Sequence, residues 1–252
     1  MNAMPTDRIR RSFSRSFGSY HCAAGPQARI ARALAQRLVD LGAPRDFGTL
    51  FEIGCGTGHL TEALHQQFSF TRSTLNDLMA EAQETARRWG ADFLPGDIRN
   101  VTWPARPDLI ASASTVQWLD DPAAVVRRAM HEVASGGWVA ISGFGPDQYA
   151  ELSALGSAAR APGLRAPDDL AAGIGPEVEI LDLWQDRQPL WFDSPLDVLR
   201  HLRETGVSGR AAQVWTRADL TDFSTRYRAA FSGPEGVRLT YHPVWIIARK
   251  PG

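Results

Sequence analysis

A glycine pattern at residues 54–58 constrains this chain more than any other stretch. An apolar run over 50–53, interrupted by Glu52, leads into Gly54, Gly56 and Gly58, which alternate with small residues. The apolar part is typical of a buried parallel strand, and a helical pattern begins directly afterwards, at Leu60. The glycines let the backbone turn sharply and approach a ligand without an intervening Cβ atom. The stretch therefore predicts a strand, a ligand-binding turn and a helix.

The acidic residue near the end of this strand favours one kind of cofactor. Glu52 repels phosphate but attracts an ammonium group, so it could orient the methionine end of S-adenosylmethionine, directly or through water. Its alternative role is charge complementarity with the N-terminus of the following helix. A dinucleotide fingerprint would place its third glycine at position 59, which is His59. We therefore expect S-adenosylmethionine. A nicotinamide or flavin domain, or a turn that only packs a helix onto a sheet, is the alternative.

Composition excludes several classes of protein. The 252 residues are 44% hydrophobic, which fits one large domain or one domain with a lid. A net charge of −1 creates no field that favours nucleic acid or an anionic membrane, and no apolar run approaches the ~20 residues of a bilayer span. The two cysteines, Cys22 and Cys55, fit a reducing cytoplasm, and the six histidines lack zinc-ligand spacing. We expect a cytoplasmic monomer without a metal.

Alternating periodicities predict an α/β fold. The pattern predicts helices over 27–41, 61–68, 79–89, 122–133 and 195–204, and strands ending at 52, near 71–75, at 93–94, and over 107–114, 138–143, 178–192 and 237–249. This order indicates a Rossmann-like, doubly wound, mostly parallel seven-stranded sheet with an antiparallel edge strand and a helical lid.

The chain reads as a single domain with four parts. Residues 1–42 are expected to form N-terminal helices and a lid, with a short basic helix over 8–20, and residues 47–144 the cofactor-binding core. Residues 145–176, rich in Ala, Gly and Pro, are expected to form a lid insertion, and residues 177–252 the C-terminal strands and helices.

Acidic residues at two further strand ends are candidate cofactor ligands, because ligands of open α/β sheets bind beyond the carboxyl ends of the strands. Asp77 lies where a ribose-binding acid belongs, with Asn76 as its substitute if the register is off by one. The alternative for Asp77 is a helix cap. Asp97 could accept from the adenine amino group while the backbone N–H of Ile98 meets a ring nitrogen. The alternative is a solvated Gly-Asp turn.

Residues after the fourth predicted strand would face the transferred methyl group. This segment runs from Ser112, a candidate cofactor residue, to Gln117 and Trp118, which are candidate catalytic residues. Trp118 could equally be a core side chain. Tyr20 could cover the cofactor as part of a mobile N-terminal lid, or could be an ordinary packed aromatic residue.

With these pieces placed, the chain resembles the class I S-adenosylmethionine-dependent methyltransferases, and more narrowly the malonyl-acyl-carrier-protein O-methyltransferases of the biotin pathway. The resemblance spans nearly the whole chain. It is carried by the segments at 11–15 with Tyr20, 52–58, 115–119, 145–152, 190–192, 199–206, 216–217, 239–242 and 247–249. The late segments are the more specific ones, and through 190–192 the resemblance implies a role for Phe192 in the active site.

The resemblance implies methyl transfer to the free carboxylate of a malonyl thioester on acyl carrier protein, with S-adenosylhomocysteine as the other product. Since a carboxylic acid is already ionised at neutral pH, no general base is needed, and the sequence shows no Ser-His-Asp arrangement. An arginine is the natural partner of the substrate carboxylate. The loop that would supply it reads Ala161-Pro162-Gly163-Leu164-Arg165 and departs from the family pattern, so Arg165, Arg160 or neither could serve.

Two other functions stay open at this point. The chain could methylate a small free acid of the aconitate type, or it could be a non-catalytic partner protein that keeps the fold, which the displaced arginine motivates. Because carrier proteins are acidic, the arginines at 8, 10, 11, 15, 200 and 203 could form a positive rim, although each could equally lie on a solvated helix face.

Overall fold

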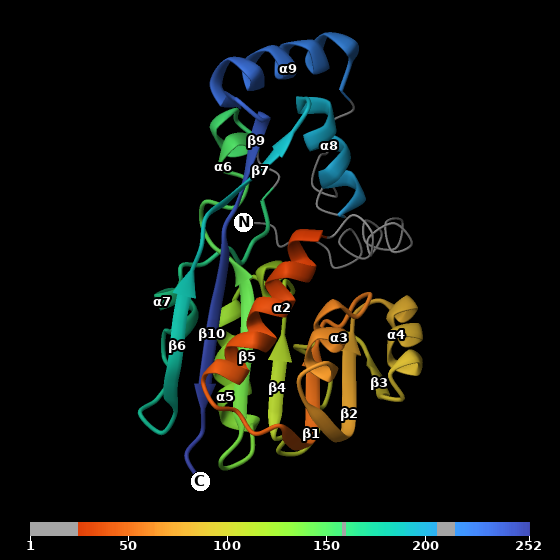
Figure 1. The fold of residues 1–252 in the computed structure, drawn as a ribbon, viewed down its shortest axis with the longest axis vertical. Coiled ribbons are helices and arrows are strands. Elements are labelled where there is room, and N and C mark those ends of the chain that lie inside the picture. The colour runs from red at the N-terminus through yellow and green to blue at the C-terminus, as the bar shows by residue number, and fades with distance from the viewer. Residues whose placement is uncertain (1–24, 158–159, 206–214) are drawn as a thin grey trace.

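The structure is a computed structural model that describes residues 25–157, 160–205 and 215–252. Tyr20 and the predicted helix over 8–20 lie outside the described residues. The elements in chain order (Figure 1) are α2 (Gly25–Asp40), β1 (Asp46–Ile53), α3 (His59–His65), β2 (Ser69–Asp77), η1 (Ala80–Ala82), α4 (Gln83–Arg88), β3 (Asp92–Pro95), β4 (Leu109–Ser112), η2 (Val116–Trp118), α5 (Pro122–Glu132), β5 (Trp138–Phe144), α6 (Ala150–Ala154), α7 (Pro167–Ala171), β6 (Glu179–Gln185), β7 (Gln188–Phe192), α8 (Pro195–Glu204), α9 (Arg217–Phe231), β8 (Ser232–Gly233), β9 (Gly236–Tyr241) and β10 (Pro243–Arg249).

Seven strands form the main sheet, in the order β3-β2-β1-β4-β5-β10-β6. The first five pair in parallel, whereas β10 pairs antiparallel with both β5 and β6. The predicted doubly wound, mostly parallel sheet is therefore confirmed. The antiparallel pairing lies at the predicted end of the sheet, but the strand that opposes the others, β10, lies one position in from edge strand β6.

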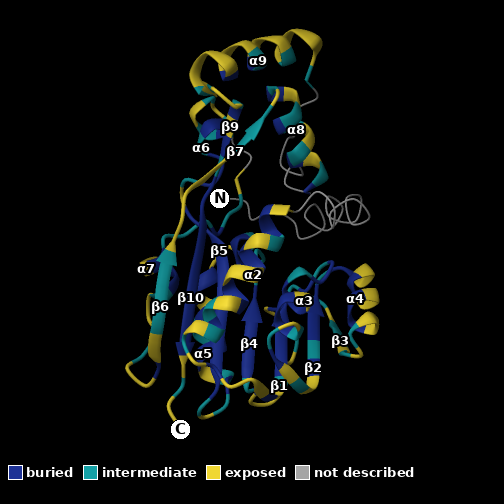
Figure 2. Cartoon of the chain, in the orientation of Figure 1, coloured by how far each residue is buried: buried dark blue, intermediate teal, exposed yellow. Residues whose placement is uncertain are grey.

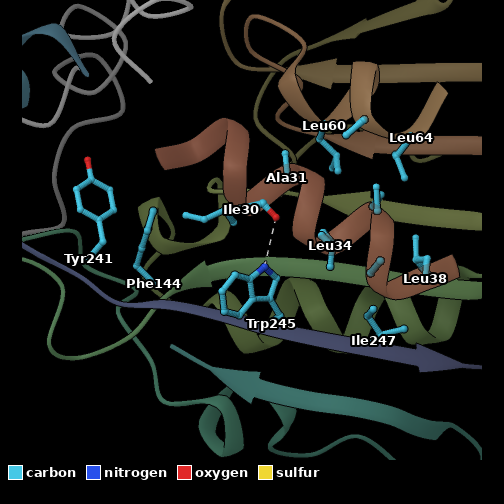
Figure 3. Close-up of a cluster of buried hydrophobic side chains, with 14 of the residues drawn as sticks. Ile30, Ala31, Leu34, Leu38, Leu60, Leu64, Phe144, Tyr241, Trp245 and Ile247 are labelled. Carbon is cyan, nitrogen blue, oxygen red and sulfur yellow. Dashed lines mark hydrogen bonds between the residues drawn. The ribbon is translucent and has the colours of Figure 1, made fainter. Parts of the chain in front are cut away.

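Helices cover both faces of the main sheet, and its central strands β4, β5 and β10 are accordingly almost continuous buried runs, whereas β2, β3 and β6 carry exposed polar residues. Along β10, Trp245 and Ile247 pack with Leu34 and Leu38 of α2, whereas Val244 and Ile246 belong to the core on the α5 face. Figure 3 shows the α2 side of this arrangement. The two-residue period of a strand thus divides the apolar residues between two cores.

A second, three-stranded sheet in the order β7-β9-β8 was not predicted from the sequence. The predicted strands over 178–192 and 237–249 are each two strands, β6 with β7 and β9 with β10. Each pair has one strand in the main sheet and one in the small sheet. Helices α8 and α9 pack against the small sheet (Figure 1). The breaks fall at Asp186-Arg187 and before Pro243, where the strands leave one sheet for the other. Helix α9, also not predicted, begins at a Thr216–Asp219 capping box, and most of its surface is exposed (Figure 2).

The segment predicted as a lid insertion, 145–176, is divided between two locations. Helix α6 packs on β9 of the small sheet, whereas α7 packs on α5 and β10 at the main sheet. Between them the loop at 161–165 is fastened by two backbone bonds, from Gly163 N to the Gln117 carbonyl (2.8 Å) and from Arg165 N to the Phe144 carbonyl (3.1 Å). A role of this segment as a lid stays a prediction.

Candidate functional site

Strands β1, β2, β3 and β4 end side by side (Figure 1). Residues at and after these strand ends line a cleft. This is the position at which ligands bind in open α/β sheets. Most of the predicted cofactor residues line this cleft, namely Glu52, Gly54, Gly56, Asn76, Asp77, Asp97 and Ile98. Gly58 and Ser112 do not.

The three glycines of the turn differ in what a Cβ atom at each position would contact. All have positive φ, but a Cβ atom at Gly54 would lie 2.3 Å from the Thr115 side chain, and one at Gly58 would lie 2.9 Å from Thr85 Cγ2. These two positions therefore allow close packing within the protein. A Cβ atom at Gly56 would meet no protein atom within 4 Å. Since Gly56 lines the cleft, the space that a side chain would occupy there is open to a ligand.

Asp77 is buried at the end of β2 and holds the cleft together. Its Oδ2 accepts from the backbone N–H of Gly56 (2.7 Å), and its Oδ1 accepts from that of Met79 (2.8 Å). Burial raises the pKa of Asp77. The bond to Met79 lies just before η1, but neither η1 nor α4 has a side-chain cap, so the helix-cap role considered from the sequence is not present. Each carboxylate oxygen has a second acceptor site, so Asp77 retains capacity for ligand hydroxyls.

Asn76, the predicted substitute for Asp77, has a separate task. Its amide Nδ2 donates to the carbonyls of Leu94 (2.9 Å) and Gly96 (3.0 Å), which ties β2 to the end of β3. Both amide hydrogens are thereby used within the protein. Asn76 thus joins two strands through its amide N–H groups, whereas Asp77 presents a carboxylate at this strand end.

Glu52 is fully buried on β1, and its Oε2 accepts from the Thr61 hydroxyl at 2.8 Å. Burial raises the pKa of Glu52 to about 8, and the nearby Asp77 carboxyl adds to the rise. The group is therefore mostly neutral at pH 7 in the free protein. A cation that entered the cleft would favour the ionised form, because an opposite charge lowers a carboxyl pKa.

Asp97 lies at the third strand end, beside Arg99. Arg99 Nε donates to Asp97 Oδ1 (2.9 Å) and Arg99 Nη2 to Oδ2 (2.5 Å), and these bonds lower the pKa of Asp97. The adjacent Ile98 carbonyl accepts from Trp103 Nε1 (3.0 Å), which fixes the backbone at this wall of the cleft. Asp97 is thus an ionised acceptor in a held loop, as an adenine contact requires.

The structure corrects the position of Ser112. Its side chain is fully buried, and its hydroxyl donates to the Ile53 carbonyl at 2.9 Å, so it joins β4 to β1 beneath the cleft. Two residues further on, Ser114 does line the cleft. Ser114 has φ of 53°, a conformation rare outside glycine that concentrates at functional sites. Sequence spacing could not reveal where the strand ends and this turn begins.

Of the predicted catalytic residues, Gln117 and Trp118 are brought to the site. Trp118 lines the cleft and also a second, smaller cavity beside it, which Gln117 lines as well. Gln117 is buried, and its Nε2 donates to the Ser114 carbonyl at 2.6 Å. Both residues belong to η2, directly after the Ser114 turn.

Arg165 and Phe192 are not brought to the site. The Arg165 guanidinium donates to the carbonyls of Leu164 (2.9 Å) and Asp120 (3.0 Å), so it holds the loop and lines neither cavity. Phe192 ends β7 in the small sheet, where its ring packs against His201. Arg160, the alternative to Arg165, does line the second cavity. Tyr20 lies outside the described residues, so its role stays a prediction.

Several polar residues of the site were not predicted from the sequence, and Gln27 and Thr57 are two of them. Gln27 lies on the buried face of α2, one turn before Ile30 and Ala31, and lines both cavities. Thr57, inside the glycine turn, lines the cleft with a buried hydroxyl that has no hydrogen-bond partner in the described structure. The position of Gln27 on the otherwise apolar stripe of α2 was the feature of the sequence that could have predicted a role in the site.

The described residues include neither a metal-binding cluster nor a membrane-spanning helix. Within 25–157, 160–205 and 215–252, no group of three or more His, Cys, Asp or Glu side chains is placed to hold a metal ion. In the same ranges no helix is long and apolar enough to cross a bilayer.

Comparison with known sequences gave two kinds of match. A family described as "Methyltransferase domain" matches residues 51–141. Malonyl-[acyl-carrier protein] O-methyltransferase of Chlorobium luteolum is 37% identical over 255 residues, covering 96% of this chain and 94% of that protein. Proteins of the same name from Prosthecochloris aestuarii and Haemophilus influenzae are 35% and 33% identical; they cover 96% and 99% of this chain, and 92% and 96% of their own lengths.

Solved structures with a similar fold include other methyltransferases. The N-methyltransferase NodS from Bradyrhizobium japonicum, in complex with S-adenosyl-L-homocysteine, matches 97% of this chain and 100% of its own with a TM-score of 0.55 at 16% identity. The YcgJ protein from Bacillus subtilis matches 87% of this chain and 99% of its own with a TM-score of 0.60 at 13% identity. At such identities the likeness shows the fold alone.

Proposed function

This chain belongs to the malonyl-[acyl-carrier protein] O-methyltransferase family, and from that premise we propose that it methylates the free carboxylate of a malonyl thioester carried by acyl carrier protein, in biotin biosynthesis. S-adenosylmethionine is the methyl donor and S-adenosylhomocysteine the product. The observation that carries the proposal is an acidic cleft at the strand ends, joined to a second cavity that holds an arginine.

The residues of the cleft fit S-adenosylmethionine. In the described part of the chain, its walls include four carboxyl side chains, Glu52, Asp77, Asp97 and Asp120, and one arginine, Arg99, which is paired with Asp97. Such a cleft suits a cationic ligand and disfavours a pyrophosphate. The cleft also offers the Thr57 hydroxyl, which has no partner in the described structure, and open space at Gly56.

Each end of the cofactor has matching groups in the cleft. Asp77 would hold the ribose hydroxyls, because a carboxylate offers two acceptor oxygens to two adjacent hydroxyls. Asp97 and the backbone at Ile98 would hold the adenine. Glu52 and the turn at Gly54 and Gly56 would hold the methionine end, where Glu52 changes from neutral to ionised opposite the ammonium group.

The chemistry requires position more than proton transfer. When bound, S-adenosylmethionine supplies a methyl group whose bond to sulfur breaks, with the electron pair left on sulfur, as the bond to a carboxylate oxygen forms. The acceptor is ionised at neutral pH, so no side chain needs to remove a proton. Trp118, which lines both cavities, and the loop at 161–165 exclude water and keep the two reactants aligned.

A carrier protein as partner is supported by the exposed face of α8. Leu196 is 48% exposed, and Arg200 and Arg203 are exposed one and two turns further along the same face. Helix α8 leads directly to Thr205, which lines the second cavity. Arg200 pairs with Asp197 on the same helix, so Arg203 and Leu196, on the helix that leads to the second cavity, are the basic and apolar groups that an acidic carrier protein would contact.

A methyl-transfer assay tests the proposal. The protein with S-adenosylmethionine should add one methyl group to malonyl-carrier protein, detected by mass spectrometry, and none to acetyl-carrier protein, which lacks the free carboxylate. Free malonate and aconitate serve as comparison acceptors. Preference for the free acids would favour the small-acid alternative, and binding of S-adenosylmethionine without turnover of any acid would favour a non-catalytic partner protein.

A further inference from the structure

The second cavity adjoins the cofactor cleft and shares three residues with it, Gln27, Ser114 and Trp118. A ligand in the second cavity would therefore lie against whatever fills the cleft. Its other walls are mixed: Phe144, Tyr149 and Leu164 contribute apolar surface, and polar side chains contribute the rest. The Tyr149 hydroxyl donates to that of Tyr241 at 3.1 Å, which holds this wall in place.

Three buried polar atoms of this cavity have no hydrogen-bond partner among the described residues. They are Gln27 Oε1, Ser114 Oγ and Gln117 Oε1, and their side chains are almost fully buried or belong to a strained turn. Buried polar groups are normally hydrogen-bonded, because a buried polar group without a hydrogen bond costs free energy. Three such atoms around one cavity indicate that a polar ligand completes their bonding.

The charge of the second cavity is opposite to that of the cleft. Arg160 is its only charged lining residue among the described parts of the chain, whereas four carboxyl groups line the cleft. The Arg160 guanidinium donates to the Pro146 carbonyl, which holds it at the cavity wall. The two adjoining cavities therefore suit a cation and an anion respectively.

Among the described residues, Arg160 is the arginine at this place with donors left for an anionic ligand. Arg165 uses its guanidinium on the carbonyls of Pro162, Leu164 and Asp120, so it is a structural group of the loop. Arg160 has five N–H donors, of which the bond to Pro146 uses one. Its remaining donors can bind a carboxylate in the two-bond geometry typical of arginine.

We propose that the second cavity is the acceptor site, in which Arg160 and the Ser114 hydroxyl donate to the substrate carboxylate, while the amide oxygens of Gln27 and Gln117 accept from N–H groups of the arm that carries it. The site takes a short carboxylate on an uncharged arm, and an acid with a second free carboxylate would leave that charge without a partner. This inference rests on the proposed function, and it adds the residues that make the enzyme specific for a free carboxylate.

Ligand binding without turnover tests this site. Calorimetric titration of the protein in the presence of S-adenosylhomocysteine would compare malonyl-pantetheine with acetyl-pantetheine, which differ in the carboxylate. The wild-type protein should prefer the malonyl ligand. Arg160→Gln should reduce that preference about 10- to 100-fold, because hydrogen bonds to a charged group are among the strong ones, and Arg160→Lys should retain part of it.

Matched variants separate this effect from a general loss of structure. Arg72→Gln removes an exposed arginine of β2 that pairs with Asp92, away from the strand ends, and should keep the full preference. On α2, Gln27→Ala should weaken malonyl-pantetheine binding, whereas Gln36→Ala, which removes an exposed side chain bonded to Asp40, should not. Affinity for S-adenosylhomocysteine should stay within about 2-fold in Arg160→Gln, because Arg160 does not line the cleft.

The outcomes distinguish this inference from the proposed function. An unchanged malonyl preference in Arg160→Gln, in a protein that methylates malonyl-carrier protein, would overturn the acceptor site alone. A wild-type protein that prefers malonyl-pantetheine in an Arg160-dependent manner but transfers no methyl group would support the site and overturn the proposed function.

Discussion

The carboxylate of Asp77 accepts a hydrogen bond from the backbone N–H of Gly56 at 2.7 Å, and this bond joins the end of β2 to the glycine turn that follows β1. The other oxygen of Asp77 accepts from the backbone N–H of Met79, just before η1. One side chain therefore shapes two walls of the cleft. A single substitution at Asp77 must affect both the fold and the ligand.

We expect Asp77→Ala to lower both stability and cofactor affinity. The substitution leaves the buried N–H groups of Gly56 and Met79 without their acceptor, at a cost of about 1–3 kcal/mol in the free energy of unfolding. Urea denaturation and calorimetric titration with S-adenosylmethionine would measure the two effects. Asp121→Ala, which removes the exposed cap of α5, is the control and should lower stability by about 1 kcal/mol without a change in affinity. Wild-type affinity in Asp77→Ala would contradict the ribose role.

Gly56→Val should abolish cofactor binding while the protein stays folded. A side chain at Gly56 meets no protein atom within 4 Å and would occupy the cleft. Gly90→Val is a matched control, because Gly90 also has positive φ and open space around its Cβ position but lies outside the cleft. Each variant should lose about 1–2 kcal/mol of stability from the left-handed backbone. Equal cofactor affinity in the two variants would contradict the proposal that the ligand lies against Gly56.

The buried Glu52 should make stability depend on pH. Its pKa is raised from 4.5 to about 8, so between these values the folded protein holds a proton that the unfolded chain has released. Its contribution to stability is therefore fully present below about pH 4.5 and is lost as the pH rises through about 8. Wild type should lose stability relative to Glu52→Gln by up to about 1.4 kcal/mol per pH unit in this window. A stability difference that does not change with pH, measured by urea denaturation, would contradict the raised pKa.

The same carboxyl group should release a proton when the cofactor binds. At pH 7 Glu52 is mostly neutral in the free protein, and the ammonium group of S-adenosylmethionine would favour its ionised form. Calorimetric titration in buffers of different ionisation enthalpy should give a proton release approaching one at pH 7, and much less in Glu52→Gln. If wild type and Glu52→Gln release equal amounts, Glu52 does not face the ammonium group.

Ser112 and Ser114 should respond to alanine in opposite ways. Ser112→Ala removes the bond to the Ile53 carbonyl and should lower the free energy of unfolding by about 1 kcal/mol, with cofactor affinity retained. Ser114→Ala removes a buried hydroxyl that has no partner in the described structure, so stability should not fall, but malonyl-pantetheine binding should weaken. The opposite assignment of these two effects would restore Ser112 as the ligand-binding residue.

The sequence determined the fold class and the cofactor end of the site. Apolar runs that end at Glu52, Asp77 and Asp97 predict parallel strands, and parallel strands bring their carboxyl ends to one edge, so spacing alone gathers these acids around the glycine turn. This part of the site is local: each residue follows its own strand directly. The helices α2, α5 and α8 were predictable for the same reason, from their own periodicity and, at α8, a helix-starting Ser-Pro pair.

Only the tertiary structure decided the acceptor end. Gln27, Ser114, Gln117 and Arg160 come from a helix, a strained turn, a 3-10 helix and a loop, so no local pattern relates them. The sequence could not choose between Arg160 and Arg165, because the choice depends on the Leu164 and Asp120 carbonyls that bind the Arg165 guanidinium. Nor could it show that two long strands bend into a second sheet. Long-range contacts decide which polar groups are satisfied within the protein, and the unsatisfied ones line the proposed acceptor site.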